Sequence, residues 1–232
     1  PAPAGQPPFS DVPAGEWYSD AAAWASESGA VLGCEDGTFR PEDPLSREQL
    51  LLILYRLARA AGEAGGWQTE ARASDWAADA AAWALARGVW QDAESDLTEA
   101  ATRAETAAVL YRYAALAAPS LTECTYDAGT ETLSYWLYTP AFAREDMPLV
   151  LYLHGGSGKG DDLSRLTEND GFPQYLMTGE ASLAAYALLP QLSSAHRGWE
   201  EITDVLVSLV EAETERLGAD PARRALSGHS MG

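Results

Sequence analysis

The chain of 232 residues is long enough for one large domain or two smaller ones, and its hydrophobic content of 47% allows a sizeable core. Its formal net charge of −20, from 35 acidic and 15 basic residues, argues against nucleic acid as a partner, because phosphate binding needs a basic face. No run approaches the roughly 18 consecutive apolar residues of a membrane helix, so no membrane span is expected. Cys34 and Cys124 are far apart and outside any cluster with histidine. We therefore expect no metal site and no cofactor, and two buried free thiols rather than a disulfide.

The N-terminal stretch leads into a first short helix. Residues 1–8 are rich in proline, alanine and glycine, which predicts an extended linker. Asp20 is predicted to cap the helix that follows, because an aspartate oxygen accepts the backbone N–H groups of a first turn. Gly29 is expected to end this helix, and Trp24 is expected on its buried side.

A longer second helix follows a loop of turn-forming residues. The loop is Asp-Gly-Thr-Phe-Arg-Pro at 36–41. Ser46 is predicted to cap a helix over 47–61, in which leucines recur at positions 50, 51, 54 and 57. This spacing places the leucines on one face, which we expect to pack in the core.

The helix–loop–helix pattern then repeats. Trp24 matches Trp83 at an offset of 59, and Arg47 matches Arg103 at an offset of 56. The difference is a three-residue deletion in the loop of the second copy. A period of this length predicts stacked helical units that share a core, and we expect Trp24 and Trp83 to pack in it.

Both repeats resemble the S-layer homology (SLH) motif. The likeness is carried by Phe-Ser-Asp-Val, by Asp-Gly-Thr-Phe-Arg-Pro and by Thr-Arg-Ala-Glu at 102–105, for which the first copy has Ser-Arg-Glu-Gln. The resemblance implies two all-α repeats, at 9–64 and 65–118, that anchor an extracellular bacterial protein to secondary cell-wall polysaccharide at the cell surface. It also implies that two arginines and two tryptophans contact the polymer: Arg47, Arg103, Trp17 and Trp76. The alternative is structural, with the arginines capping helices or pairing with neighbouring acids.

After residue 118 the pattern changes to strands that alternate with helices. Alternating apolar side chains predict a strand at 132–139, and a short apolar run at 149–153 predicts a strand buried on both faces. A third strand is expected at 183–189, then an amphipathic helix at 202–217, and a last strand before Gly228. This order predicts an α/β unit with a mostly parallel sheet, so the chain as a whole is expected to be multidomain.

Two motifs that carry chemistry follow strands of this sheet. The first, Gly-x-Ser-x-Gly at 228–232, allows a sharp turn that exposes the hydroxyl of Ser230. The second, His-Gly-Gly-Ser-Gly after the strand at 149–153, is a loop of the kind that supplies oxyanion-hole amides. We therefore expect Ser230 to be a nucleophile in acyl transfer. The expected oxyanion donors are backbone N–H groups of Met231 and of Gly155 or Gly156, with Gly156 preferred.

This half resembles the α/β-hydrolase fold, and within it the esterases related to polyhydroxybutyrate depolymerases and feruloyl esterases. The likeness spans 123–232 and is carried by Leu-His-Gly-Gly-Ser-Gly, a Leu-Pro-Gln strand end, Arg-Gly-Trp at 197–199 and the Gly-His-Ser-Met-Gly turn. It implies that 119–232 is the first part of a carboxylic ester hydrolase acting on a small or polymeric ester outside the cell. Two alternatives stay open: a serine peptidase of the same fold, and a non-catalytic surface protein with a degenerate hydrolase half.

None of the three histidines is expected to be the catalytic base. We expect His154 to support its loop, His229 to pack beside the serine and His196 to lie exposed. In α/β-hydrolases the acid and the histidine of the triad follow the serine in the chain. We therefore expect the chain to be a fragment that is inactive by itself.

Overall fold

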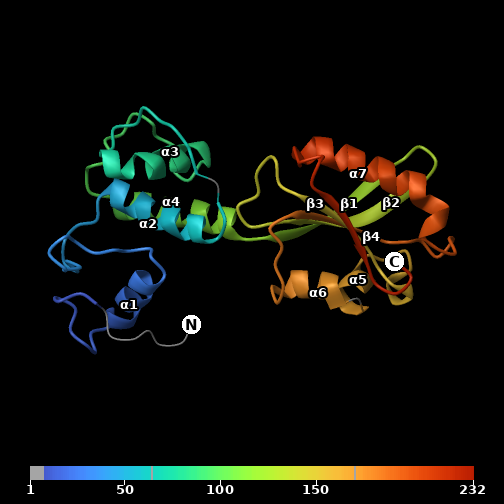
Figure 1. The fold of residues 1–232 in the computed structure, drawn as a ribbon, viewed down its shortest axis with the longest axis horizontal. Helices are drawn as coiled ribbons and strands as arrows, with labels where there is room; N and C mark the ends of the chain where they lie inside the picture. The colour runs from blue at the N-terminus through green and yellow to red at the C-terminus, as the bar shows by residue number, and fades with distance from the viewer. Residues whose placement is uncertain (1–7, 64, 170) are drawn as a thin grey trace. The chain divides into compact units, whose positions relative to one another are not determined.

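The computed structural model describes residues 8–63, 65–169 and 171–232, and the chain divides into a helical unit up to Ala115 and a sheet-based unit from Leu116 (Figure 1). The predicted linker at 1–8 lies outside the described residues, apart from Pro8. We describe each unit separately.

The described part of the first unit is built from helices joined by irregular loops. α1 spans Ser19–Glu27 and α2 spans Arg47–Ala60. A 3-10 turn at Asp75–Ala77 leads into α3 at Ala78–Ala86, and α4 at Arg103–Ala117 ends just past the boundary of the unit. The second predicted helix is therefore confirmed to within one residue.

The helices of the first repeat begin differently. α2 has the predicted cap: the Ser46 hydroxyl accepts the Gln49 N–H at 3.2 Å, and the Gln49 side chain accepts the Ser46 N–H at 2.9 Å. In α1 the N-cap position belongs to Tyr18, so the prediction for Asp20 is wrong. Asp20 lies within the first turn instead, where a carboxylate still favours the positive end of the helix dipole.

Trp83 on α3 is fully buried and forms the centre of the helical core. The ring of Tyr55 on α2 lies 5.5 Å from it, and Tyr113 on α4 packs edge-on at 6.4 Å. Trp24 is 44% exposed, so core packing is confirmed for Trp83 and wrong for Trp24. The reason is that α1 turns its alanine face, with Ala22, toward Phe9 and Val12, which leaves the indole on the other side.

The second unit is built on a five-stranded sheet with the order β1-β2-β4-β3-β5. Its strands are β1 at Ser120–Asp127, β2 at Thr132–Thr139, β3 at Leu149–Leu153, β4 at Tyr186–Pro190 and β5 at Arg224–Gly228. β3 pairs in parallel with β4 and β5, whereas β2 pairs antiparallel with β1 and β4. The predicted α/β class is confirmed, but the sheet is mixed rather than mostly parallel, because the β1–β2 hairpin adds antiparallel strands at one edge.

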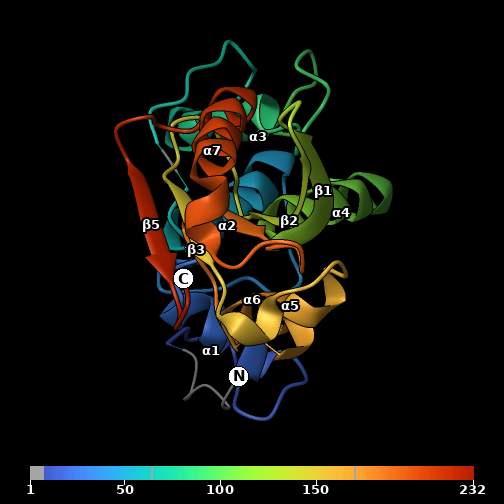
Figure 2. The same ribbon diagram turned by 90° about the vertical axis from the view of Figure 1, so that its right-hand side faces the viewer.

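Helices cover both faces of this sheet (Figures 1 and 2). α7 at Thr203–Leu217 follows a 3-10 turn at Trp199–Ile202 and packs on one face with Leu209 buried. α5 at Ser164–Asn169 and α6 at Gly171–Thr178 lie on the other face. Every residue of β4 is buried between these layers. The parallel strands therefore present their carboxyl ends at one edge, where sites form in α/β sheets.

Candidate functional sites

Ser230 lies in a sharp turn directly after β5. Its φ is 56°, in the left-handed region that residues other than glycine seldom adopt and that costs of order 1–3 kcal/mol. The Gly232 N–H donates to the His229 carbonyl at 3.0 Å and closes the turn. The His229 N–H donates to the Leu153 carbonyl at 3.1 Å, which ties the turn to the end of β3. The serine itself is exposed.

Two glycines allow this turn to pack against β3. A Cβ on Gly232 would lie 2.1 Å from the Leu153 carbonyl oxygen. A Cβ on Gly228 would lie 2.5 Å from the carbonyl carbon of Gly232. Both contacts are with backbone atoms, which cannot move aside as a side chain can. The Gly-x-Ser-x-Gly spacing is therefore required by the close approach of backbone to backbone.

The loop after β3 approaches the serine, so the structure brings these predicted residues together. A Cβ on Gly155 would lie 3.3 Å from the Cβ of Ser230. Among the described residues, the N–H groups of Gly156 and Met231 donate no hydrogen bond to the protein. Met231 follows Ser230 in the chain and Gly156 follows Gly155, and backbone N–H groups that donate no other hydrogen bond are the kind that can hold a negatively charged oxygen.

His154 is buried inside this loop rather than turned toward the serine. Its Nε2 accepts the Leu192 N–H at 3.0 Å, so the ring proton is on Nδ1, which donates to the Gly155 carbonyl at 2.6 Å. Trp199 packs edge-on against the imidazole at 4.8 Å and donates its Nε1–H to the His154 carbonyl at 3.1 Å. The predicted supporting role of His154 is confirmed.

His196 is held between two glutamates. Its Nε2 lies 2.7 Å from an Oε of Glu131, and its Nδ1 lies 3.4 Å from an Oε of Glu201. The hydrogen bond to Glu131 is the largest cause that raises the pKa of His196. The expectation of an exposed His196 is wrong, because the fold brings both acids to its ring and leaves 23% of the side chain accessible. With both ring nitrogens engaged, neither His154 nor His196 can serve as a base for Ser230.

Of the predicted polysaccharide contacts, Arg47 is engaged within the protein. Its guanidinium pairs with Glu105 at 2.9 Å and with Glu99 at 3.0 Å, and it donates to the Asp96 carbonyl at 2.8 Å. Only 14% of the side chain is exposed. These contacts correspond to the structural alternative that the sequence left open.

The other three predicted contacts lie at the surface. Trp17 is 91% exposed and Trp76 is 55% exposed. Arg103 is exposed too, and within the described part of the chain it forms no ion pair. The structure does not bring the four residues together into one site. Of the four, only Trp76 lines the cavity described next.

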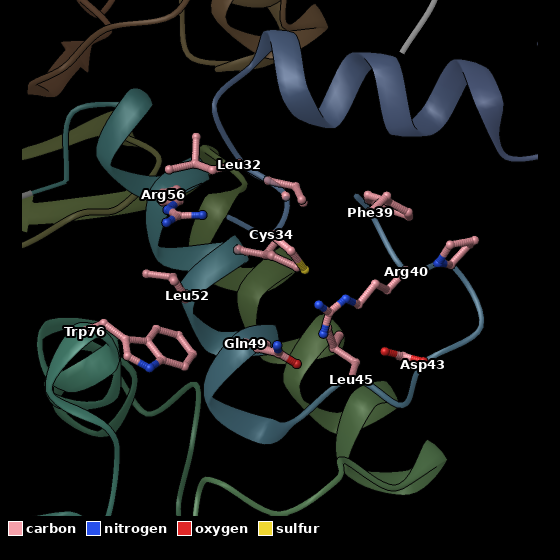
Figure 3. A pocket seen from close by; sticks show the side chains of 14 residues that line it. Leu32, Cys34, Phe39, Arg40, Asp43, Leu45, Gln49, Leu52, Arg56 and Trp76 are labelled. Atoms are coloured by element: carbon pink, nitrogen blue, oxygen red, sulfur yellow. The ribbon is translucent and has the colours of Figure 1, made fainter. Parts of the chain in front are cut away.

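This repeat-1 cavity, of about 440 Å³, lies between the segment after α1, α2 and the turn that carries Trp76 (Figure 3). Its wall is mostly apolar, with Leu32 and Leu52 among the side chains that form it. Arg40 and Arg56 bring positive charge to it. Arg56 was not among the residues predicted from the sequence, although its match to Arg112 at an offset of 56 marks it as part of the repeat.

Arg56 is a cation without an acid beside it. Its Nη1 donates to the Ala30 carbonyl at 3.3 Å, and no carboxylate among the described residues pairs with it. Burial lowers the pKa of Arg56, because the half-buried guanidinium has lost part of its hydration. Arg40, by contrast, pairs with Asp36 at 2.9 Å.

The described residues contain no group of three His, Cys, Asp or Glu side chains arranged to hold a metal ion. Nor does any described helix combine the length and apolar character needed to cross a bilayer.

Cys34 and Cys124 are free thiols, but they are half-buried rather than buried as expected. Cys34 forms part of the wall of the repeat-1 cavity.

Comparison with known proteins assigns the first repeat. Residues 8–51 match the S-layer homology domain. Outer membrane protein SlpA of Thermus thermophilus is 49% identical over 49 residues, 21% of this chain and 5% of SlpA. Exoglucanase XynX of Acetivibrio thermocellus is 33% identical over 114 residues, 44% of this chain and 10% of XynX. The chain thus spans a tenth or less of these relatives. The segment is an S-layer homology domain, and the predicted cell-surface location is confirmed.

Solved esterases are similar to this chain at lower identity. A thermostable esterase from Pseudomonas putida ECU1011 is 19% identical, with a TM-score of 0.36, over 57% of this chain and 42% of the esterase. A structure described as bacterial heroin esterase is 22% identical, with a TM-score of 0.36, over 54% of this chain and 41% of that protein.

Proposed function

We propose that this chain, with its S-layer homology domain, belongs to a cell-surface serine hydrolase that cleaves carboxylic esters. One observation carries the proposal: Ser230 adopts a left-handed conformation after β5, beside the Gly155 loop, and the N–H groups of Gly156 and Met231 donate no hydrogen bond to the described residues. A serine without a catalytic role in a glycine-rich turn would not be expected to combine a strained backbone with neighbouring N–H groups that donate no hydrogen bond.

The proposed chemistry is acyl transfer through a covalent intermediate. The Oγ of Ser230 attacks the acyl carbon of the ester, and the carbonyl oxygen becomes an oxyanion held by the N–H groups of Met231 and Gly156. When the carbonyl re-forms, the bond to the alcohol oxygen breaks and the alcohol leaves with the proton taken from the serine; water then hydrolyses the acyl-serine. Each donor of this kind contributes about 3 kcal/mol to the stability of the transition state. The proton of the serine must pass to a base. His154 and His196 are engaged elsewhere, so neither is proposed as that base.

Turnover of p-nitrophenyl acetate by the whole protein that carries this segment tests the proposal. Ser230→Ala should abolish turnover without lowering the melting temperature. Ser227→Ala, three residues earlier on the exposed strand β5, is the matched control and should retain it. Full turnover by the Ser230 variant would remove the serine from the reaction and leave a surface protein whose hydrolase half is not catalytic.

We further infer that the helical unit anchors the protein to acidic secondary cell-wall polysaccharide. The exposed Arg103, Trp17 and Trp76 are the proposed contacts, since a guanidinium binds a carboxylate and an indole face suits a sugar ring. Arg47 is proposed to act through the fold, by holding Glu105 and Glu99. Retention of the chain on purified sacculi tests this, and Arg103→Ala should reduce it. Equal retention by the variant would limit Arg103 to a structural role.

A further inference from the structure

Gln191 lies directly after β4 and is only 4% exposed although its side chain is polar. Both hydrogens of its amide nitrogen are engaged, since Nε2 donates to the Gly158 carbonyl at 3.0 Å and to the Asp162 carbonyl at 2.8 Å. These two carbonyls belong to the loop at 154–162 that follows β3, which we call the β3 loop. One buried side chain thus holds the β3 loop at two points.

The backbone beside Gln191 attaches the β3 loop as well. The Leu192 carbonyl accepts the Gly160 N–H at 3.0 Å, and the Leu192 N–H donates to Nε2 of His154 at 3.0 Å. On the other side, the Gln191 N–H donates to the Ser134 carbonyl of β2 at 2.9 Å. The end of β4 therefore connects the β3 loop to the sheet through side-chain and backbone hydrogen bonds together.

These hydrogen bonds act on the peptide between Gly155 and Gly156, which carries one of the proposed oxyanion donors. The Gly155 carbonyl accepts the Gly158 N–H at 3.1 Å and the proton on Nδ1 of His154 at 2.6 Å. In a trans peptide such as this one, the C=O and the N–H point to opposite sides of one plane. Holding the Gly155 carbonyl in place therefore also sets the direction of the Gly156 N–H.

Both groups that hold the Gly155 carbonyl depend on the end of β4. Gly158 is held through its own carbonyl by Gln191, and His154 is held through Nε2 by the N–H of Leu192. Without the Gln191 amide, the Gly158 carbonyl would lose this buried partner, and the turn at 156–158 could shift. A shifted donor stabilises a transition state less, because a hydrogen bond to an oxyanion depends on preorganised geometry.

We propose that Gln191 is a positioning residue for ester hydrolysis: by holding the β3 loop against the end of β4, it keeps the Gly156 N–H in the direction that the oxyanion requires. Gln191 acts through Gly158 rather than on the substrate. This inference rests on the proposed function and adds to it a residue outside both sequence motifs of the site.

Gln191→Met tests this role in the whole protein, because methionine has a similar length and no strong hydrogen-bond donor. We expect kcat for p-nitrophenyl acetate to fall about tenfold or more and KM to change less than about twofold, since the oxyanion develops only in the transition state. Gln174→Met, at an exposed glutamine of α6, is the matched control and should leave both constants unchanged. Thermal unfolding checks that each variant is folded.

Gln191→Glu separates hydrogen bonding from packing. A carboxylate cannot donate to the two carbonyls, whereas a protonated carboxyl group donates one hydrogen bond, and burial raises the pKa of a carboxyl group. The kcat of this variant, relative to that of the unaltered protein, should therefore rise as the pH falls from about 9 to about 6. A ratio that stays constant over this interval would mean that Gln191 contributes packing alone and would overturn the inference.

Amide hydrogen exchange gives a readout that needs no turnover. The Gly160 N–H, which donates to the Leu192 carbonyl, should exchange about tenfold faster in Gln191→Met, because the β3 loop opens locally. Unchanged exchange, or full kcat in this variant, would overturn the inference and leave Ser230 as the proposed nucleophile. An unaltered protein that hydrolyses no ester, or full turnover by Ser230→Ala, would instead overturn the proposed function, and the inference with it.

Discussion

Arg47 at the start of α2 forms an ion pair with Glu105 of α4, with 2.9 Å between Nη2 and Oε1, so the matching motifs of the two repeats hold each other. Two backbone hydrogen bonds also connect the start of α2 with the segment before α4. The Arg47 N–H donates to the Glu99 carbonyl at 2.9 Å, and the Glu48 N–H donates to the Leu97 carbonyl at 2.8 Å. An arginine expected to face a polymer is thus part of the connection between repeats.

Arg47→Ala should destabilise the helical unit. The change leaves Glu105 and Glu99 without their cation, and it removes hydrogen bonds to charged groups, so the free energy of unfolding should fall by about 2 kcal/mol. Arg103→Ala is the matched control at the equivalent position; it is exposed and should change stability by less than about 0.5 kcal/mol. Urea denaturation measures both. Similar losses of unfolding free energy in the two variants would argue against a stabilising role for the Arg47–Glu105 pair.

The buried ion pair between Arg87 and Glu63 should contribute more to the free energy of unfolding than a surface pair does. The Glu63 side chain is fully buried, and the two groups are 3.0 Å apart. Arg87→Ala leaves that carboxylate buried without its cation, which should cost about 3 kcal/mol of unfolding free energy. Arg72→Ala removes a comparable pair with Asp96 from a side chain that is 73% exposed, and should cost less than about 1 kcal/mol. An Arg87 variant as stable as the Arg72 variant would contradict the stronger contribution expected of the buried pair.

His196 should titrate above the ordinary histidine pKa of about 6.5. The groups that face it are Glu131, which is the largest cause of the raised pKa, Glu201 and the ammonium of Lys159, which donates to the His196 carbonyl. Because the folded state holds the proton more tightly than the unfolded chain, this stabilisation is complete below about pH 6.5 and is lost as the pH rises through the folded pKa.

An NMR titration of the His196 ring measures this directly. Glu131→Gln should return the pKa toward its ordinary value, and Glu201→Gln should lower it less, because the second glutamate lies 3.4 Å from the ring rather than 2.7 Å. The stability advantage of the unaltered chain over the Glu131 variant should shrink between pH 6 and pH 9. An advantage that grows over that interval would reverse the assigned sign.

Gly232→Ala should detach the serine turn from β3. A Cβ there would lie 2.1 Å from the Leu153 carbonyl oxygen, whose hydrogen bond from the His229 N–H holds the turn. We expect amide exchange at His229 to accelerate about tenfold or more, because the turn opens locally. Gly156→Ala is the control, since a Cβ at that position meets nothing within 4 Å. Unchanged exchange in the Gly232 variant would show that the turn does not depend on this contact.

Elements with a strong local pattern were predicted well. The helix after Ser46 begins where its cap predicts, and the strands at 132–139 and 149–153 have the predicted bounds. β1 was missed, because its side chains are mainly polar and mostly exposed, and its pairing with β2 defines it. β4 begins at Tyr186 rather than at 183, because only residues opposite β2 and β3 join the ladder.

The sequence by itself determined the repeats, the Ser46 cap and the serine turn, because these depend on residues close together in the chain: a hydroxyl three residues from an amide, or glycines on either side of Ser230. Only the tertiary structure decided which charges meet. Glu105 is 58 residues from Arg47, and Trp76 reaches the cavity of Arg56 from the other repeat. Ion pairs and desolvation depend on separation in space, so matching arginines in one motif can be paired, exposed or left without an acid.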